Sequence, residues 1–301
     1  MRYAVTGAAG FIGSQLAETL RERGHDVVGF DAFTDYYDVR EKEENARGLD
    51  VRRIDLADDA DFAGFDGVFH LAGQPGVRSF GDVFELYVRR NLLASRRVFE
   101  AAAAAGARVV FASSSSVYGD AETYPTPEDA QPQPISPYGI TKLACEHLAR
   151  AYARGFGLDV VTLRYFTVYG PRQRPDMAIR RIVDALATGG AYEIYGEPTS
   201  RSFTYVADAV DATIAAMEGG GGVYNVGGGE EASMLDVIGE LERISGRTLD
   251  VRRAPAAAGD VRRTKADVTR IGADLGWQPR TRLEDGLRAQ WEWASARVGA
   301  R

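Results

Sequence analysis

The chain has 301 residues, of which 45% are hydrophobic and 26% charged, and its formal net charge is −7. This ordinary globular composition contains no apolar run near the roughly 20 residues needed to span a membrane, and its acidic balance disfavours a nucleic-acid partner, which requires a basic face. One cysteine and three histidines provide neither an internal disulfide nor a convincing zinc site, so we expect a cytoplasmic protein without a metal.

Short apolar runs alternate with helical patterns along the first half of the chain, beginning with RYAVTG, which predicts a strand and not a signal peptide. The predicted strands lie at 2–7, 26–31, 51–55, 67–73, 108–116 and 159–166, and the predicted helices at 11–24, 83–106 and 138–156. Strand and helix alternating at this spacing indicate right-handed crossovers. The pattern therefore predicts an α/β fold with a doubly wound parallel sheet of the Rossmann type.

The regular alternation of strands and helices ends after about residue 170. There the turn-rich YGPRQRPD precedes a helix, a short strand at 191–196, glycine-rich loops and a C-terminal helix near 283–298. We expect a Rossmann domain over 1–170 and a smaller α/β substrate-binding subdomain over 171–301, some of whose chain returns to the first domain. Ligands of open α/β sheets bind at the carboxyl edge of the strands, so the subdomain should cover that edge.

TGAAGFIG places Gly7, Gly10 and Gly13 between the first strand and the first helix. Glycines let the backbone approach a pyrophosphate, and the helix N-terminus supplies free N–H groups. Asp31 ends the second strand, where a carboxylate binds ribose hydroxyls and favours NAD over NADP. Asp55 is either a further wall of this site or a capping carboxylate. The predicted NAD site also includes Phe11, Ile12, Leu56, Leu71, Ala72, Gly73, Tyr138 and Lys142.

A reaction centre is predicted where the apolar strand RVVF ends in four serines and SPYGITK follows. Tyr138 and Lys142 are four positions apart in a helical pattern and share one face. A phenol with an ordinary pKa near ~10 is a poor base at neutral pH, but a neighbouring ammonium and a nicotinamide ring favour the phenolate. Ser114, at the strand exit, is expected to hydrogen-bond the same substrate hydroxyl.

The whole chain resembles the extended short-chain dehydrogenase/reductases that act on nucleotide sugars. The resemblance rests on TGAAGFIG, HLAGQPGVRSF, SSSSVYG, SPYGITK, RYFTVYGPRQRPD, SRSFTYVAD and GDVRRTKAD. It implies a tightly held NAD that oxidises a sugar hydroxyl and re-reduces the ketone, with Tyr138 as base, Lys142 as its partner and Ser114 as a polar contact. It also implies that Asn91 supports helix packing, that Arg201 binds the nucleotide diphosphate, and that Asp260 and Arg262 lie near the nucleotide.

The serine run distinguishes branches of this family. Its dehydratases carry an Asp–Glu pair after the catalytic Ser or Thr, because removing water needs a second acid and base. Here those positions are Ser115 and Ser116, which we assign to substrate binding. The UDP-glucuronate decarboxylases typically have Glu at the position of Ser116. Of these three reactions epimerisation remains, because it needs only one base and a ketone that is free to turn over.

Two segments, DAFTDYYDVREKEENARG and RYFTVYGPRQRPDMA, are most similar to those of the UDP-glucuronate 4-epimerases. That similarity implies that Thr167 and Arg174 bind the sugar carboxylate, with Arg78 and Arg172 as candidate helpers, since Arg offers a carboxylate a planar two-pronged fit. Arg174 could instead bind the diphosphate or face solvent. The predicted reaction converts UDP-glucuronate to UDP-galacturonate through a transient 4-keto sugar.

Two other functions stay open at this point. One is 4-epimerisation of a neutral UDP-hexose, UDP-glucose or UDP-N-acetylglucosamine, and the other is NAD sensing without chemistry. The family resemblance also implies a homodimer formed through the helices at 82–105 and 139–155, whose apolar side chains could equally belong to the core: Leu86, Val88, Leu92, Leu93, Leu143 and Leu148.

Overall fold

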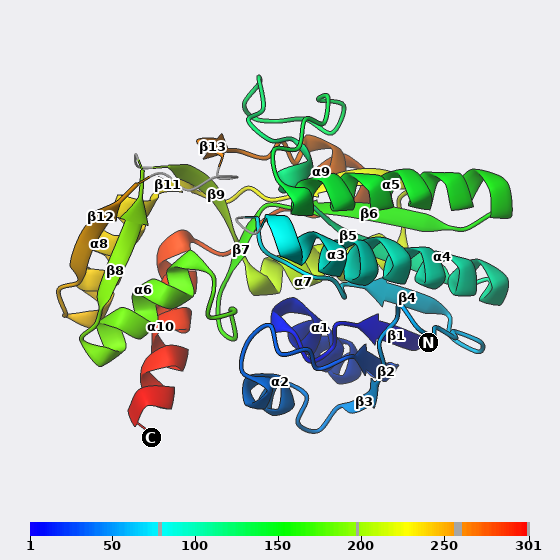
Figure 1. Ribbon diagram of the computed structural model, residues 1–301, viewed down its shortest axis with the longest axis horizontal. Helices are drawn as coiled ribbons and strands as arrows, with labels where there is room; N and C mark the ends of the chain where they lie inside the picture. Colours follow the sequence, from blue (N-terminus) through cyan, green and yellow to red (C-terminus); the bar gives the residue numbers. More distant parts are fainter. Residues whose placement is uncertain (78–79, 197–198, 256–260, 300–301) are drawn as a thin grey trace.

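The computed structural model describes residues 1–77, 80–196, 199–255 and 261–299. Its largest sheet consists of β1 (Arg2–Thr6), β2 (Asp26–Asp31), β3 (Asp50–Arg53), β4 (Gly67–His70), β5 (Arg108–Ser114), β6 (Val160–Tyr165) and β10 (Gly222–Val226). All seven strands are parallel and follow the order β10-β6-β5-β4-β1-β2-β3 (Figure 1). The predicted doubly wound parallel sheet is confirmed, and β10 adds an edge strand that the sequence patterns did not predict.

Helices cover both faces of this sheet. On one face α1 (Phe11–Glu22) and α7 (Val206–Glu218) share a buried apolar cluster that includes Leu16 and Val210. On the other face α4 (Ala94–Ala105) and α5 (Pro137–Phe156) share a second cluster that includes Phe99 and Cys145. These two cores pack against the two faces of the sheet and hold its strands in place.

The single helix predicted over 83–106 is divided into several segments. A 3-10 turn (Gly81–Val83) and α3 (Phe84–Tyr87) lead into a π-helical segment (Val88–Leu93), after which α4 begins. π-Helical turns are rare and occur mainly near functional sites. This one contains Asn91, whose side chain is buried beside the cofactor pocket described below.

The remaining elements form the smaller subdomain, which lies to the left in Figure 1. The short strands β7 (Thr167–Tyr169), β9 (Ser200–Tyr205), β11 (Glu231–Ser233) and β13 (Arg263–Thr264) form one sheet, and β8 (Ala191–Tyr195) pairs with β12 (Asp250–Ala254). A third apolar cluster joins α6 (Ala178–Thr188), α8 (Met234–Ser245) and α10 (Leu283–Gly299). α2 (Val39–Asn45) belongs to the larger domain, and α9 (Thr269–Leu275) contacts β10.

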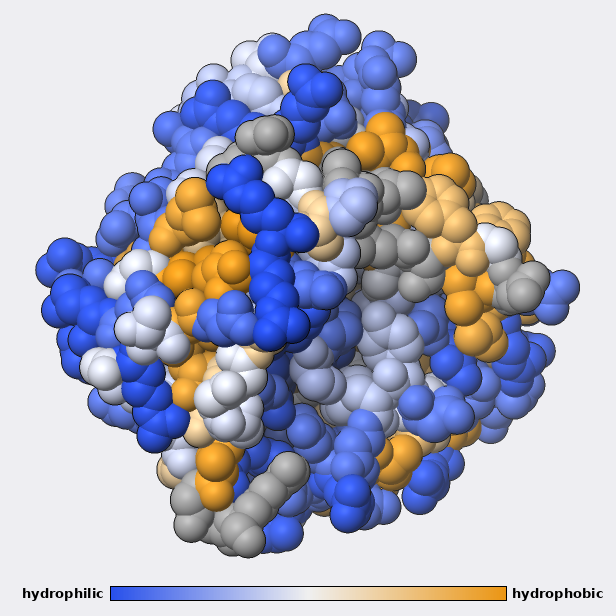
Figure 2. Space-filling view, turned by 60° about the vertical axis from the view of Figure 1, so that its left-hand side comes forward, coloured by the Kyte–Doolittle hydropathy of each residue, from blue (hydrophilic) through white to orange (hydrophobic). Residues whose placement is uncertain are grey.

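Figure 2 turns the smaller subdomain toward the reader, and hydrophobic side chains gather there in separate patches on a mainly hydrophilic surface that is hollowed near its middle. In the described ranges, no helix is both long and apolar enough to cross a membrane. The same residues contain no group of three or more His, Cys, Asp or Glu side chains placed to hold a metal ion.

Candidate active site

A pocket lies at the carboxyl ends of the central strands. Its walls bring together all the residues predicted to bind the cofactor: Gly7, Gly10, Phe11, Ile12, Gly13, Asp31, Asp55, Leu56, Leu71, Ala72, Gly73, Tyr138 and Lys142. These residues come from the ends of four strands and from the first turns of the two helices α1 and α5, so the sheet topology brings them together. Ligands of open α/β sheets bind at this edge.

The turn between β1 and α1 requires glycine. Gly7 has φ +71°, and a Cβ there would lie 3.0 Å from the backbone nitrogen of Ala72. A Cβ on Gly13 would lie 2.1 Å from the carbonyl oxygen of Gly7. No side chain caps the start of α1, where Gly10 is the N-cap, so its first N–H groups are available to a phosphate. The turn therefore fits the pyrophosphate of a dinucleotide.

Asp31 is fixed by two backbone donors at the end of β2. Its Oδ2 accepts from Ala9 N at 3.1 Å and its Oδ1 from Phe33 N at 2.7 Å. Each carboxylate oxygen can accept a further hydrogen bond, so the carboxylate remains able to bind ribose hydroxyls. Asp55 combines both roles considered for it: its Oδ1 accepts from Ala57 N at 2.9 Å, as a capping carboxylate does, and the residue lines the pocket.

Lys42, on α2, is a pocket residue that the sequence patterns did not single out. Its Nζ donates to the carbonyl oxygen of Thr34 at 2.6 Å and to the Thr34 hydroxyl at 3.0 Å. Burial lowers the pKa of the ammonium, and the nearby charge of Asp31 opposes that shift. Lys42 thus places a cation beside the predicted ribose-binding carboxylate. Its position in a polar segment, VREKEEN, carries no signal that distinguishes it from a surface lysine.

The start of α5 presents Tyr138 and Lys142 to the pocket. Ser136 caps the helix by accepting from Gly139 N at 3.1 Å, and Pro137 occupies the first turn. Lys142 Nζ donates to the carbonyl oxygen of Ala112 at 2.8 Å and lies 5.9 Å from the centroid of the Tyr138 ring. The ammonium is therefore held close to the phenol by the sheet itself.

Ser114 ends β5 and begins the 3-10 turn Ser115–Val117. Its hydroxyl accepts from Ser116 N at 3.1 Å and contacts the Ser116 hydroxyl at 3.1 Å. None of Ser114, Ser115 and Ser116 is among the described residues that line the cofactor pocket. The structure thus places the serine run at the carboxyl edge of the sheet, at the end of the strand whose Ala112 lines the pocket with Tyr138.

Asn91 connects the loop after β4 to α5. Its Oδ1 accepts from Gln74 N at 2.7 Å, and its Nδ2 donates to Gln74 O and to the Thr141 hydroxyl, both at 3.1 Å. The side chain is 1% exposed. Asn91 therefore holds the backbone of a pocket wall against the helix that carries Tyr138, in line with the packing role that we expected for it.

The residues predicted to bind the substrate divide between two hollows. Arg174 lines the cofactor pocket with Tyr138, whereas Thr167 and Arg201 line a second hollow between β7, β8, β9 and α6. Gln173, beside Arg174 in the chain, also lines the second hollow, so the segment before α6 borders both. The two proposed carboxylate ligands thus do not share one hollow.

The other residues predicted to lie near the substrate or its nucleotide do not gather in one place. Arg201 donates to the carbonyl oxygens of Val261, at 2.6 Å, and Arg262, at 3.2 Å, so it holds the backbone that carries Arg262. Arg172, a candidate helper, instead forms an ion pair with Glu18 on α1 at 2.9 Å. Arg78 and Asp260 lie outside the described residues.

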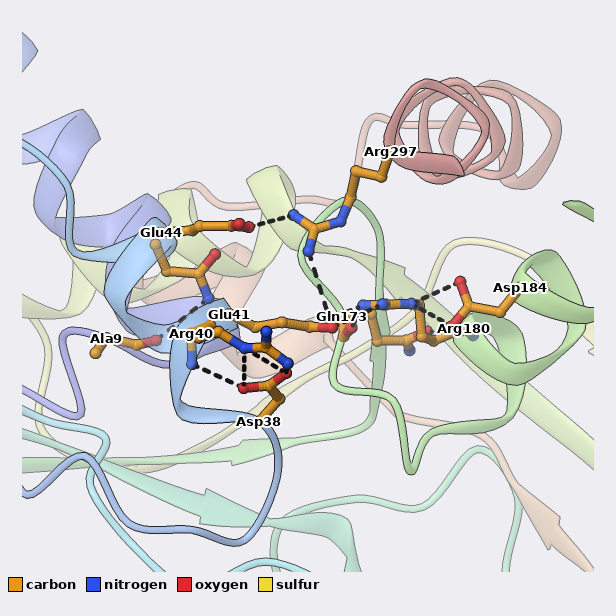
Figure 3. A network of polar contacts seen from close by, with 10 residues as sticks. Ala9, Asp38, Arg40, Glu41, Glu44, Gln173, Arg180, Asp184 and Arg297 are labelled. Carbon is orange, nitrogen blue, oxygen red and sulfur yellow. Dashed lines mark hydrogen bonds and ion pairs between the residues drawn. The ribbon is translucent and has the colours of Figure 1, made fainter. Parts of the chain in front are cut away.

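A network of polar contacts fixes the segment that carries Arg174 (Figure 3). Arg180 on α6 donates to Gln173 O at 2.9 Å and pairs with Glu41 on α2 at 3.2 Å. Arg297 on α10 pairs with Glu44 on α2 at 2.7 Å. α2 of the larger domain is therefore tied to α6 and α10 of the smaller subdomain, and the cofactor pocket lies next to this connection.

A Rossmann-type sheet with a glycine turn, a carboxylate at the end of β2 and a Tyr–Lys pair on one helix defines a short-chain dehydrogenase/reductase-like enzyme. The chain belongs to the NAD dependent epimerase/dehydratase family, whose model matches residues 3–227.

Similar proteins cover almost the full length of the chain. The uncharacterized UDP-glucose epimerase YtcB of Bacillus subtilis is 39% identical over 98% of both chains. The UDP-glucuronic acid 4-epimerase of Bacillus cereus, solved with UDP-glucuronic acid and NAD, has a TM-score of 0.94 and 38% identity and covers 98% of this chain and 99% of its own. MoeE5, also solved with UDP-glucuronic acid and NAD, has a TM-score of 0.90 and 42% identity, with 99% and 100% coverage.

Proposed function

We propose that this protein is an NAD-dependent UDP-glucuronate 4-epimerase that interconverts UDP-glucuronate and UDP-galacturonate. The observation that carries the proposal is the position of Arg174, a cation in the same pocket as Tyr138 and Lys142. A uronate differs from a neutral hexose by its carboxylate, and a guanidinium is the side chain best suited to bind one. Similarity to structures solved with UDP-glucuronic acid and NAD supports the same substrate.

The chemistry at carbon 4 needs one base. Tyr138 accepts the proton of the carbon-4 hydroxyl and returns it later, and the ammonium of Lys142 lies 5.9 Å from the centroid of the Tyr138 ring. NAD, when bound, supplies reversible hydride transfer at carbon 4. The 4-keto sugar turns over before it is reduced on its opposite face. Ser114 lies at the same sheet edge and is assigned to the substrate hydroxyl.

Arg174 has a second task in this proposal. A ketone at carbon 4 is beta to the carboxylate on carbon 6, so the 4-keto sugar can lose carbon dioxide. Loss requires the breaking carbon–carbon bond to align with the ketone π system. Arg174, together with Thr167, holds the carboxylate away from that alignment. Because Thr167 lies in the neighbouring hollow, we expect the sugar to bridge the two hollows when it binds.

The serines after β5 support epimerisation over the other reactions of the family. Ser116 bonds the hydroxyl of Ser114, and neither Ser115 nor Ser116 provides an acid or a base for water removal. A single base at Tyr138 is sufficient for oxidation and reduction of the same carbon.

We infer a cytoplasmic homodimer without a nucleic-acid partner. Phe84, Leu93 and Ile140 are 45%, 42% and 50% exposed and belong to the α3–α4 and α5 regions expected at the interface. The net charge of −7 supports the absence of a nucleic-acid partner. Of the other apolar side chains predicted on these helices, Leu92 and Leu148 pack on the core of the larger domain. Light scattering after size-exclusion chromatography tests the dimer, and a monomeric mass refutes it.

The test of the function is incubation of the purified protein with UDP-glucuronate and NAD, followed by proton NMR of the sugar. Appearance of UDP-galacturonate without accumulation of NADH supports the proposal, and Tyr138→Phe is the inactive control. Conversion of UDP-glucose or UDP-N-acetylglucosamine, with no turnover of the uronate, would establish the neutral-hexose epimerase instead. Turnover of none of them would favour the sensor. Arg174→Ala is expected to release UDP-pentose or abolish uronate turnover, and unchanged kinetics refute its assignment.

A further inference from the structure

We propose that Asp176 and Tyr36 are positioning residues that orient Arg174 for the substrate carboxylate, and so determine selectivity for a uronate. The inference rests on the proposed function, because it assigns a purpose to the carboxylate contact of Arg174. It adds two residues that no family motif used above assigns to substrate selection.

Asp176 binds only one side of the Arg174 guanidinium. Nε donates to Oδ1 and Nη2 donates to Oδ2, both at 3.0 Å. A guanidinium carries five N–H donors in one plane, and two pairs of them can each bind a carboxylate. Asp176 occupies the side-on pair formed by Nε and Nη2. Among the described residues, Nη1 has no hydrogen-bond partner, so the end-on pair formed by Nη1 and the second N–H of Nη2 remains for a ligand.

The position of Arg174 places this remaining pair of N–H donors at the cofactor pocket. Arg174 lines the cofactor pocket, and its charge interacts with Tyr138. Its side chain is 24% exposed, which is well below the exposure of a surface arginine. Burial alone would lower the pKa of Arg174, but the charge and hydrogen bonds of Asp176, together with Tyr36 and Tyr138, outweigh it and the pKa ends above its ordinary value. A permanent cation with a defined orientation therefore faces the reaction centre.

Tyr36 connects this pair to the larger domain. Its hydroxyl donates to Asp176 Oδ2 at 3.3 Å, and it lines the same pocket. Burial, and then the charge of Asp176, raises the pKa of Tyr36 to about 12, so the phenol keeps its proton at neutral pH and remains a donor. Arg174 and Asp176 are close in the chain, whereas Tyr36 lies far from both. The carboxylate that orients Arg174 is thus held from both domains.

Further hydrogen bonds hold the segment around Arg174, which favours positioning over competition. The side-chain amide of Gln173 accepts from Arg180 N at 2.9 Å and donates to Val168 O at 3.0 Å, so the residue beside Arg174 is held on both sides. If Asp176 occupied both pairs of donors, it would compete with a uronate. Because it occupies one, it restricts the rotation of the side chain and lowers the entropy lost when the substrate carboxylate binds.

The test compares Asp176→Asn and Tyr36→Phe with wild type. Steady-state rates with UDP-glucuronate give kcat and KM, and calorimetry gives Kd for UDP-glucuronate and UDP-glucose. Asp176→Asn keeps the size of the side chain but removes its charge and one acceptor. We expect KM and Kd for UDP-glucuronate to rise about tenfold or more, Kd for UDP-glucose to change less than about twofold, and release of UDP-pentose to increase. Tyr36→Phe should show the same pattern with a smaller change.

The matched control is Asp211→Asn, which removes a carboxylate paired with Arg23 at 2.6 Å on the outer surface of α7 and should leave all constants unchanged. Equal weakening of both nucleotides by Asp176→Asn would mean that Asp176 merely supports the fold of the segment, and a lower KM for UDP-glucuronate would mean that it competes with the substrate. Either result overturns the inference and leaves the proposed function intact. Failure of the wild-type protein to convert UDP-glucuronate overturns both.

Discussion

The strongest single perturbation of stability is expected at the buried ion pair between Arg164 on β6 and Glu146 on α5. The two side chains are 6% and 4% exposed, and Nη2 lies 2.7 Å from Oε2 while Nε donates to Oε1 at 3.0 Å. Ser113, next to Ser114, donates to the same Oε1 at 2.5 Å. The remaining Arg164 nitrogen, Nη1, donates to the Tyr118 hydroxyl at 2.8 Å and to Glu128 O at 3.0 Å. Three donors, two from Arg164 and one from Ser113, thus converge on one buried carboxylate.

Arg164→Met leaves that carboxylate buried with only the Ser113 hydroxyl as donor. Breaking a buried pair by removing one partner costs roughly 3–5 kcal/mol. The bonds to Tyr118 and Glu128 are also lost, at about 1 kcal/mol each. The double variant Arg164→Met/Glu146→Leu loses the same two bonds but leaves no buried charge. We therefore expect the single variant to be destabilised by about 5 kcal/mol and the double variant by about 2 kcal/mol.

Equilibrium urea unfolding at pH 7, followed by tryptophan fluorescence, measures both variants. Asp159→Asn is the matched control, because Asp159 pairs with Arg108 at 2.7 Å but is 61% exposed, and exposed pairs contribute only about 0–1 kcal/mol. The reasoning is refuted if Arg164→Met unfolds within about 1 kcal/mol of wild type, or if the double variant is less stable than the single one.

Three further outcomes follow from the site. Tyr138→Phe should lower kcat by roughly 10²–10⁴-fold with NAD affinity retained, as measured by epimerisation rates and cofactor titration. Burial, and then the charge of Lys142, lowers the pKa of His70 to about 3, so the unfolded chain binds a proton before the folded chain does. Unfolding free energy should thus fall by up to ~1.4 kcal/mol per pH unit below pH ~6.5, and urea titrations of His70→Gln should lack this slope. Asp31→Ser should weaken NAD about tenfold or more and reduce its preference over NADP in parallel titrations.

The larger domain could be predicted because its strands are buried on both faces. Such strands form short, continuous apolar runs, and the helices between them show their own periodicity. β10 escaped prediction because GVYNV lies among glycines and becomes a strand only by pairing with β6, far away in the chain. α2 escaped because VREKEEN has no apolar face, and its buried residues, Lys42 and Asn45, are polar. The π-helical segment Val88–Leu93 could not be separated from α4, because both helix types place apolar residues at nearly the same intervals.

The candidate site shows the same division between local and distant signals. Gly7, Asp31 and Tyr138 occupy strand ends and a helix start, where sequence spacing and sheet topology together determine their meeting point. Whether an arginine is oriented toward a substrate depends instead on side chains that approach it in the folded chain. The sequence alone leaves Arg174 open to diphosphate binding, solvation or carboxylate recognition.

Contacts between the two domains limit which of these three roles Arg174 can take. Asp176 restricts one side of the Arg174 guanidinium, and Tyr36, from the loop between β2 and α2, restricts Asp176. Substrate selectivity in this fold should therefore depend on the pair that orients the arginine as much as on the arginine itself. It follows that an arginine introduced alone at the equivalent position of a neutral-hexose epimerase would have no neighbouring side chains to orient it. Transfer of Arg174 with Asp176 and Tyr36 should be needed before that enzyme distinguishes UDP-glucuronate from UDP-glucose.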